Sequence, residues 1–272
     1  FYGRKKEIKE IIDNIDKKVE VYGIGGVGKS KLVDIVLLLQ KFKGKKVISV
    51  GLGHHNEKDS SFYYTNRNND KQHFIVDNHI INIYHVLEAM SELVKNIEDI
   101  EKNKEDKIIS IILNVIKENN VLLFIDDFQN VNESVINLVK KLDNIIIASR
   151  KLTGLADKEV FLTGIQEEFR ENLVNRYCKL LNVDPDENIK RKIQNFAEGH
   201  PLSTQLLLRN IDKIIVENID ELNLKYFDIN QVREYSDHVF KQILSTDALS
   251  LLGSIAVIDT ELDYNLEREI VE

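Results

Sequence analysis

Apolar residues in the first part of the chain gather in short continuous runs that alternate with amphipathic stretches. The runs predict strands at 19–23, 46–51, 121–126, 145–149 and 159–162. Because charged residues bound each run, we expect these strands to be buried on both faces of a parallel sheet. The stretches between them predict helices at 4–16, 29–43, 80–101, 105–119 and 133–142. This alternation predicts an α/β fold, a parallel sheet flanked by helices.

The pattern changes after residue 163, where the strand signals stop. Three segments then have the period of amphipathic helices, at 166–181, 186–199 and 202–219. Asp184-Pro185-Asp186 predicts a helix start, and Gly199-His200-Pro201 predicts the end of one helix and the start of the next. A further helix is expected at 231–252, so the second part of the chain is predicted to be helical.

Residues 53–79 interrupt the first pattern, because they are polar, carry scattered aromatic residues and have no clear period. We interpret them as an insertion or mobile loop after the second strand. Most of the histidines lie in or beside this segment: His54, His55, His73, His79 and His85. They could form a metal site, but their spacing matches no zinc motif, and a solvated loop is the favoured alternative.

Composition narrows the class of protein. The 272 residues are 43% hydrophobic and 30% charged, as in ordinary globular proteins, and no apolar run is long enough to predict a membrane span. The single cysteine, Cys178, fits a cytoplasmic protein and a packing role on a helix. The net charge of −8 argues against a broad nucleic-acid surface. The chain starts without a methionine or a signal-peptide pattern, so we expect it to be part of a longer protein.

The most specific motif follows the first predicted strand. Residues 23–30, GIGGVGKS, match the phosphate-binding pattern G-x-x-x-x-G-K-[ST]. The glycines allow backbone N–H groups to point at phosphate, Lys29 would neutralise the β and γ oxygens, and the Ser30 hydroxyl would ligate Mg²⁺. A strand before and a helix after distinguish the motif from a glycine-rich turn that binds nothing. The expected nucleotide contacts here are Gly25, Gly26, Val27, Gly28, Lys29, Ser30 and Lys31.

A second motif, VLLFIDD at 121–127, ends a predicted buried strand in two acids. Asp126 would hold Mg²⁺, and Asp127 would orient or deprotonate an attacking water. The alternative is a strand that simply ends in two solvent-facing acids. The pairing with GIGGVGKS favours a P-loop ATPase.

The next predicted strand, NIIIASR, ends in Arg150. A guanidinium at this position could contact the γ-phosphate, an interaction that exists only when ATP is bound. The alternative is an arginine that only solvates a strand end, and the position favours the sensing role. The candidate catalytic residues are therefore Lys29, Asp127 and Arg150.

In this order the motifs resemble those of the STAND class of P-loop ATPases, close to the NB-ARC and archaeal-ATPase branches of the AAA+ relatives. GIGGVGKS resembles the family's Walker A motif, FIDDF its Walker B motif and IIIASR its sensor-1 strand. FYGRKKEI, at 1–8, is similar to the hhGRxxEh motif, whose apolar pair and arginine border the adenine pocket. EGHPL, at 198–202, is similar to the GxP motif, whose proline packs against the nucleotide from a helical lid. The resemblance adds these expected contacts of ATP or ADP: Phe1, Tyr2, Arg4, Pro201 and Leu202.

The resemblance also implies a domain organisation and a function. It implies a nucleotide-binding α/β domain at 1–163, a helical lid domain at 164–230 and a partial winged-helix domain at 231–272. Such a chain is expected to be an ATP/ADP switch in signal transduction or defence, closed with ADP and self-associating with ATP. Slow hydrolysis would reset it, and sensor or effector domains are expected elsewhere in a longer chain.

Two other functions share parts of this pattern. An AAA+ motor or loader acting on DNA would carry the same motifs, and the acidic charge balance argues against it. A module that binds nucleotide without hydrolysing it would need only the P-loop, and the presence of Asp127 argues against that.

Overall fold

The computed structural model describes residues 3–52, 73–76, 80–94 and 105–209, and the statements below concern these residues. They form a six-stranded sheet in the order β3-β2-β4-β5-β1-β6, in which every pair of neighbours is parallel. The strands are β1 (Lys18–Tyr22), β2 (Lys46–Leu52), β3 (His73–Val76), β4 (Val121–Ile125), β5 (Ile145–Ser149) and β6 (Lys158–Phe161).

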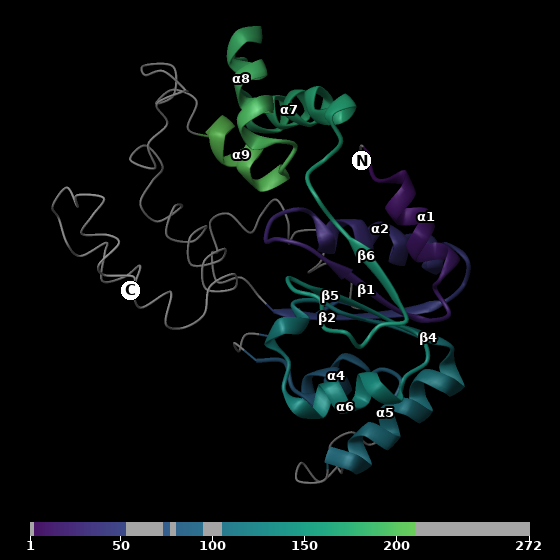
Figure 1. Ribbon diagram of the computed structural model, residues 1–272. Helices are drawn as coiled ribbons and strands as arrows, with labels where there is room; N and C mark the ends of the chain where they lie inside the picture. Colours follow the sequence, from purple (N-terminus) through teal and green to yellow (C-terminus); the bar gives the residue numbers. More distant parts are fainter. Residues whose placement is uncertain (1–2, 53–72, 77–79, 95–104, 210–272) are drawn as a thin grey trace, which may run out of the picture. The chain divides into compact units, whose positions relative to one another are not determined.

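Helices cover both faces of this sheet. On one face lie α1 (Lys5–Asp13) and α2 (Lys29–Phe42), and on the other lie α4 (Ile83–Ala89), α5 (Glu105–Asn119) and α6 (Glu133–Lys141) (Figure 1). Side chains alternate between the two apolar cores, so that Leu122 and Phe124 of β4 belong to one and Leu123 and Ile125 to the other. Every residue of β4 and of β5 is buried. The predicted parallel α/β sheet is confirmed.

The segment 53–79 contains a strand that the sequence did not predict. Residues His73–Val76, expected to belong to an insertion or mobile loop, form β3 and pair in parallel with β2. The strand is only four residues long and lies at the edge of the sheet, where one side needs no partner. A run this short inside a polar stretch gives little periodic signal. The expectation of a loop is therefore wrong at these residues.

Of the helix predicted at 80–101, the structure describes residues 80–94, and only part of these is helical; residues 95–101 lie outside the described residues. Helix α4 begins at Ile83, because the Asn82 side chain accepts hydrogen bonds from the N–H groups of Tyr84 and His85. It ends at Ala89, and the chain then turns, with Leu93 N–H donating to the Met90 carbonyl at 2.8 Å. The apolar residues of 83–94 fill the core from a short helix and a turn.

The order of the strands determines which loops meet. Parallel strands present their carboxyl ends at one edge, so the loops after β1, β4 and β5 share that edge. Because β5 lies between β1 and β4, the turn after β5 lies between the loop after β1 and the acids after β4.

The helical part consists of α7 (Glu167–Leu181), α8 (Glu187–Ala197) and α9 (Pro201–Arg209). Asp186 caps α8 by accepting from Ile189 N–H at 2.9 Å, and Pro201 is the first residue of α9, as the sequence predicts. The described residues all belong to one compact unit. The division at 163 and 230 stays a prediction, and the expected winged helix lies outside the described residues.

The segment that leads into α7 and the segment that leads into α9 are in direct backbone contact. Ile165 N–H, before α7, donates to the carbonyl of Gly199, before α9, at 2.8 Å. A Cβ at Gly164 would collide with the carbonyl oxygen of Glu198, and one at Gly199 would collide with that of Ile165. Glycine is required at both positions because the two backbones are in contact.

None of the described helices is both long enough and apolar enough to cross a membrane.

Candidate functional site

The loop between β1 and α2 contains three glycines with positive φ, Gly23 at 151°, Gly26 at 74° and Gly28 at 98°. Gly28 is the N-cap of α2, and no side chain of the described residues caps this helix. A Cβ built on Gly28 would meet nothing within 4 Å, so the space in front of the helix start is open. Unpaired first-turn N–H groups beside open space suit a phosphate.

Lys29, the first residue of α2, turns back over this loop. Its Nζ donates to the carbonyl oxygen of Gly23 at 2.8 Å and to that of Ile24 at 3.0 Å. Burial lowers the pKa of Lys29 to about 8, an effect that Asp126 opposes and Arg150 reinforces. The ammonium group therefore lies within the electrostatic reach of both residues.

The two acids after β4 differ in environment. Asp126 is buried, and its N–H donates to the Val50 carbonyl at 2.8 Å. Gly51 makes room for it, because a Cβ there would lie 3.1 Å from Asp126 Cβ. Asp127 is less buried and has a left-handed backbone with φ of 52°, and its N–H donates to Asp126 Oδ1 at 3.0 Å. The turn thus keeps Asp126 inside and leaves Asp127 nearer the surface.

Arg150 belongs to the same charged group. Burial lowers the pKa of its guanidinium, while Asp127 and then Asp126 act in the opposite direction. The structure therefore brings Lys29, Asp126, Asp127 and Arg150 to one edge of the sheet, as the sequence predicts. Their individual roles stay predictions.

The residues expected to hold Mg²⁺ are oxygen donors of the kind this ion prefers. Ser30, half-buried, is the second residue of α2, and Asp126 follows β4 at the same edge of the sheet. This donor set fits a magnesium ion on a phosphate. Lys31 points its exposed side chain away from the buried face of α2, so its expected contact with nucleotide would come from its backbone.

The start of α9 lies directly on the phosphate loop. His200 Nε2 is 2.9 Å from the carbonyl oxygen of Gly25, and Ser203 N–H donates to His200 Nδ1 at 3.2 Å. Because Nδ1 accepts, the proton of the neutral ring is on Nε2, which donates to Gly25. Burial lowers the pKa of His200, and the nearby Lys29 adds to this. A neutral imidazole therefore joins the helical part to the loop.

Leu202 makes a second contact between α9 and the loop. A Cβ built on Gly26 would lie 2.6 Å from Leu202 Cβ and 3.0 Å from His200 Cε1. Gly26 is thus the position at which α9 rests on the loop. The sequence placed His200 in the EGHPL lid motif but assigned nucleotide contacts only to Pro201 and Leu202, whereas the side chain that bonds to the loop is His200.

Arg4 connects the N-terminal segment to the same loop. Its guanidinium is buried and donates to the carbonyl oxygens of Thr163 and Val27, the latter at 3.5 Å, and pairs with Glu7 at 3.1 Å. These contacts place Arg4 beside Val27, one of the expected nucleotide contacts. Phe1 and Tyr2, the other expected contacts at this end, lie outside the described residues.

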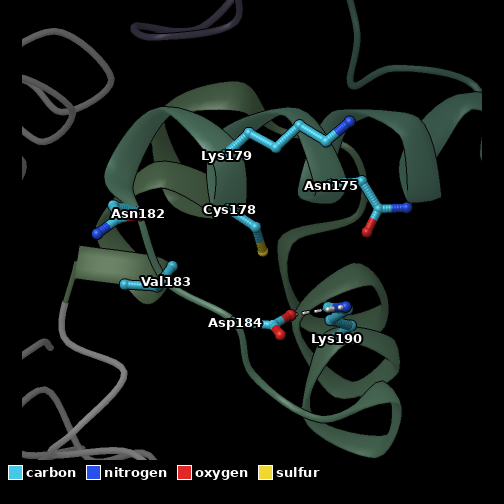
Figure 2. Close-up of a pocket in the computed structure, with 7 residues that line it drawn as sticks. All are labelled: Asn175, Cys178, Lys179, Asn182, Val183, Asp184 and Lys190. Atoms are coloured by element: carbon cyan, nitrogen blue, oxygen red, sulfur yellow. Dashed lines mark ion pairs between the residues drawn. The ribbon is translucent and has the colours of Figure 1, made fainter.

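A separate pocket lies between the C-terminal end of α7 and α8 (Figure 2). Cys178 lines it, and burial raises the pKa of this thiol, which agrees with the packing role expected from the sequence. Lys190, on the other wall, pairs with Glu187 at 2.9 Å and with Asp184 at 3.6 Å. The pocket shares no residue with the phosphate loop, and its thiol is not activated.

The histidine-rich segment gives no metal site among the residues that the structure describes, where no cluster of three or more potential ligands occurs. His54, His55 and His79 lie outside those residues. His85 instead accepts from Asn82 N–H at 3.1 Å and so completes the cap of α4.

Comparisons with known proteins bear on the fold. No family model and no curated protein sequence matches the chain. Among solved structures, Cdc6p from Pyrobaculum aerophilum superposes with a TM-score of 0.53 at 11% identity, covering 99% of this chain and 79% of that one. The likeness shows a shared fold, a parallel α/β sheet flanked by helices.

Two further solved structures are similar at lower scores. A Walker-type ATPase of Pyrococcus abyssi has a TM-score of 0.49 at 14% identity, covering 100% of this chain and 88% of that one. The Holliday junction branch migration motor RuvB of Thermotoga maritima has a TM-score of 0.47 at 12% identity, covering 93% and 76%.

Proposed function

We propose that this chain is an ATP/ADP-binding molecular switch of the STAND type that hydrolyses ATP slowly. The contact between His200 Nε2 and the Gly25 carbonyl, 2.9 Å long, is the observation that carries the proposal. It joins the helical part to the loop that would hold the phosphates, so a ligand on the loop acts directly on the docking of α9. A ligand shifts such an equilibrium only through unequal affinity for the two states.

The charged residues at the loop would make the affinities of ATP and ADP for the two states unequal. Lys29 would contact the β and γ phosphates, and Arg150 the γ-phosphate, which ADP lacks. Ser30 and Asp126 would hold Mg²⁺, which neutralises phosphate charge when bound. Asp127, the more exposed acid, would orient the attacking water. ATP and ADP therefore differ in what they offer to Arg150 and Asp127.

The proposed switch also implies binding partners. With ADP, α9 stays on Gly25 and Gly26, and with ATP it leaves them and frees its first turn for contact with a second copy of the chain. Sensor and effector domains of a longer protein would supply the trigger and the output, in signal transduction or defence.

Nucleotide content and oligomeric state test this proposal. We expect the purified protein to release ADP on denaturation, identified by chromatography, and light scattering to show larger assemblies with a slowly hydrolysed ATP analogue than with ADP. A protein that holds no nucleotide and binds neither form would refute the proposal. Fast turnover stimulated by DNA would instead indicate a motor, and ATP binding without any hydrolysis would indicate a passive binding module.

A further inference from the structure

Glu20 is an acid in the middle of β1 with no exposed surface. Its neighbours in the strand, Val19 and Val21, belong to the apolar core. A buried carboxylate is costly unless hydrogen bonds compensate for the lost water. None of the residues expected to bind nucleotide accounts for its presence.

The hydrogen bonds of Glu20 all come from the last residue of β5 and from the turn that follows it. Ser149 Oγ donates to Oε1 at 2.6 Å, and Thr153 N–H donates to Oε1 at 3.0 Å and to Oε2 at 3.2 Å. Thr153 Oγ1 donates to Oε2 at 2.8 Å. Both carboxylate oxygens are therefore used to hold this turn.

These partners lie on either side of Arg150. Ser149 precedes it directly, and Thr153 follows three residues later. The Ser149 hydroxyl is also 2.6 Å from the carbonyl oxygen of Lys151, and Thr153 Oγ1 accepts from Leu155 N–H at 3.3 Å. The backbone that carries the Arg150 side chain is thus fixed at both ends to one rigid strand.

The same strand carries the phosphate loop, which begins at Gly23, three residues after Glu20. We infer that Glu20 is a positioning residue, which holds Arg150 in place relative to the phosphate loop and so sets the preference for ATP over ADP. The inference rests on the proposed function, in which Arg150 contacts the γ-phosphate. A misplacement of about 1 Å in such a contact is enough to lose most of its benefit.

Paired variants separate this role from a merely structural one. Glu20→Leu removes every acceptor. Glu20→Gln keeps an oxygen for Thr153, and its amide can donate to Ser149 Oγ, which then donates to Lys151. We would measure the Kd of ADP and of a slowly hydrolysed ATP analogue for both variants, each alone and combined with Arg150→Ala.

We expect Glu20→Leu to lower the ratio of ATP to ADP affinity by about fivefold or more, with the ADP Kd changed less than about twofold. Glu20→Gln should keep the wild-type ratio. In the Arg150→Ala background, Glu20→Leu should have no further effect, because coupled residues are not additive. Glu159→Leu is the matched control, since Glu159 is exposed and pairs with Glu20 in the register of β6.

Three results would overturn the inference. In the first, Glu20→Leu leaves the ratio unchanged while Arg150→Ala lowers it, and the proposed function then survives without this role. In the second, Glu20→Leu lowers the ratio equally in both backgrounds. In the third, Arg150→Ala itself has no effect, so that the γ-phosphate contact and the inference fail together. If Glu20→Leu does not fold, Thr153→Val, at an exposed residue, removes one donor from the same turn and should lower the ratio partly.

Discussion

His200 Nε2 lies 2.9 Å from the carbonyl oxygen of Gly25, although 175 residues separate the two in the chain. The Gly25 carbonyl and the Gly26 N–H belong to one planar peptide unit and point in opposite directions. A donor that fixes the carbonyl therefore also fixes the N–H. In the same way Lys29, which donates to the carbonyls of Gly23 and Ile24, fixes the N–H groups of Ile24 and Gly25. The helical part thus helps to orient the groups that would bind phosphate.

Replacing His200 tests this relationship. His200→Leu removes the donor, so the Gly26 N–H loses its orientation, and we expect ADP to bind about tenfold more weakly. His200→Gln retains an N–H that can reach Gly25 and should keep most of the affinity. Calorimetric titration with ADP measures both.

Ser203→Ala is the control for the His200 variants, because it removes the hydroxyl that lies 3.0 Å from Nδ1 but keeps the backbone N–H that donates to Nδ1 and leaves the Nε2 contact with Gly25 in place. It should bind ADP like the wild type. Equal affinities of His200→Leu and the wild type would show that the docking of α9 has no part in nucleotide binding.

Lys29→Ala should weaken the binding of both ATP and ADP by at least about 100-fold, because it removes the ammonium group that donates to the carbonyls of the loop. Lys43→Ala, an exposed lysine at the far end of the same helix, should leave both affinities unchanged. Fluorescence titration with a labelled nucleotide measures the difference, and undiminished binding by Lys29→Ala would contradict the phosphate-loop assignment.

The pH dependence of ADP binding follows from the pKa of Lys29, about 8 in the free protein. Phosphate oxygens beside the ammonium raise this pKa in the complex. Binding then takes up a proton above pH 8, so the affinity falls as the pH rises, by up to about tenfold per pH unit. Calorimetry from about pH 7 to 9.5 shows the slope. A flat profile in the wild type would contradict the proposed contact, and Lys29→Ala should remove the slope.

The same group predicts the opposite trend for the free energy of unfolding without nucleotide. The folded pKa of Lys29 is lowered from 10.5 to about 8, so between these values the unfolded chain binds more protons than the folded one. This contribution makes the protein more stable as the pH rises through this window, and it is complete near pH 10.5. The difference between urea unfolding curves of the wild type and Lys29→Met, measured at several pH values, isolates it.

Asp127→Asn should bind ATP with an affinity within about threefold of the wild type and hydrolyse it at least about 100-fold more slowly. The amide cannot take the proton of an attacking water. Asp143→Asn, at an exposed acid beyond α6, is the control and should keep both properties. Phosphate release in single-turnover experiments measures the rate, and an unchanged rate would show that another residue positions the water.

The sheet and the phosphate loop could be predicted because each leaves a local signal. The fully buried β4 and β5 are continuous apolar runs, and GIGGVGKS needs its residue types at fixed spacing. Strand β3 leaves almost no local signal, because its four residues depend on pairing with β2 for their structure.

The roles that we propose for two residues were hidden for a related reason. His200 acquires its role only when the chain folds back on Gly25, and the sequence cannot show that distance. Glu20 did leave a sign, since it is the one acid within the apolar strand that precedes the phosphate loop. A charge inside a strand that is buried on both faces requires partners, but only the fold shows that they lie on either side of Arg150.

The junction of Ile165 with Gly199 has a mechanical consequence. Helices α7 and α8 leave and rejoin the chain there and both pack on α9, so that a small rotation about this backbone contact would carry the three helices as one body. Helix α7 has 15 residues and is therefore about 22 Å long, and a turn of about 10° at the pivot would displace its far end by about 4 Å. A fluorescent label at position 182, just beyond that end, would move by several times more than a label near Gly164 and would therefore report the rotation.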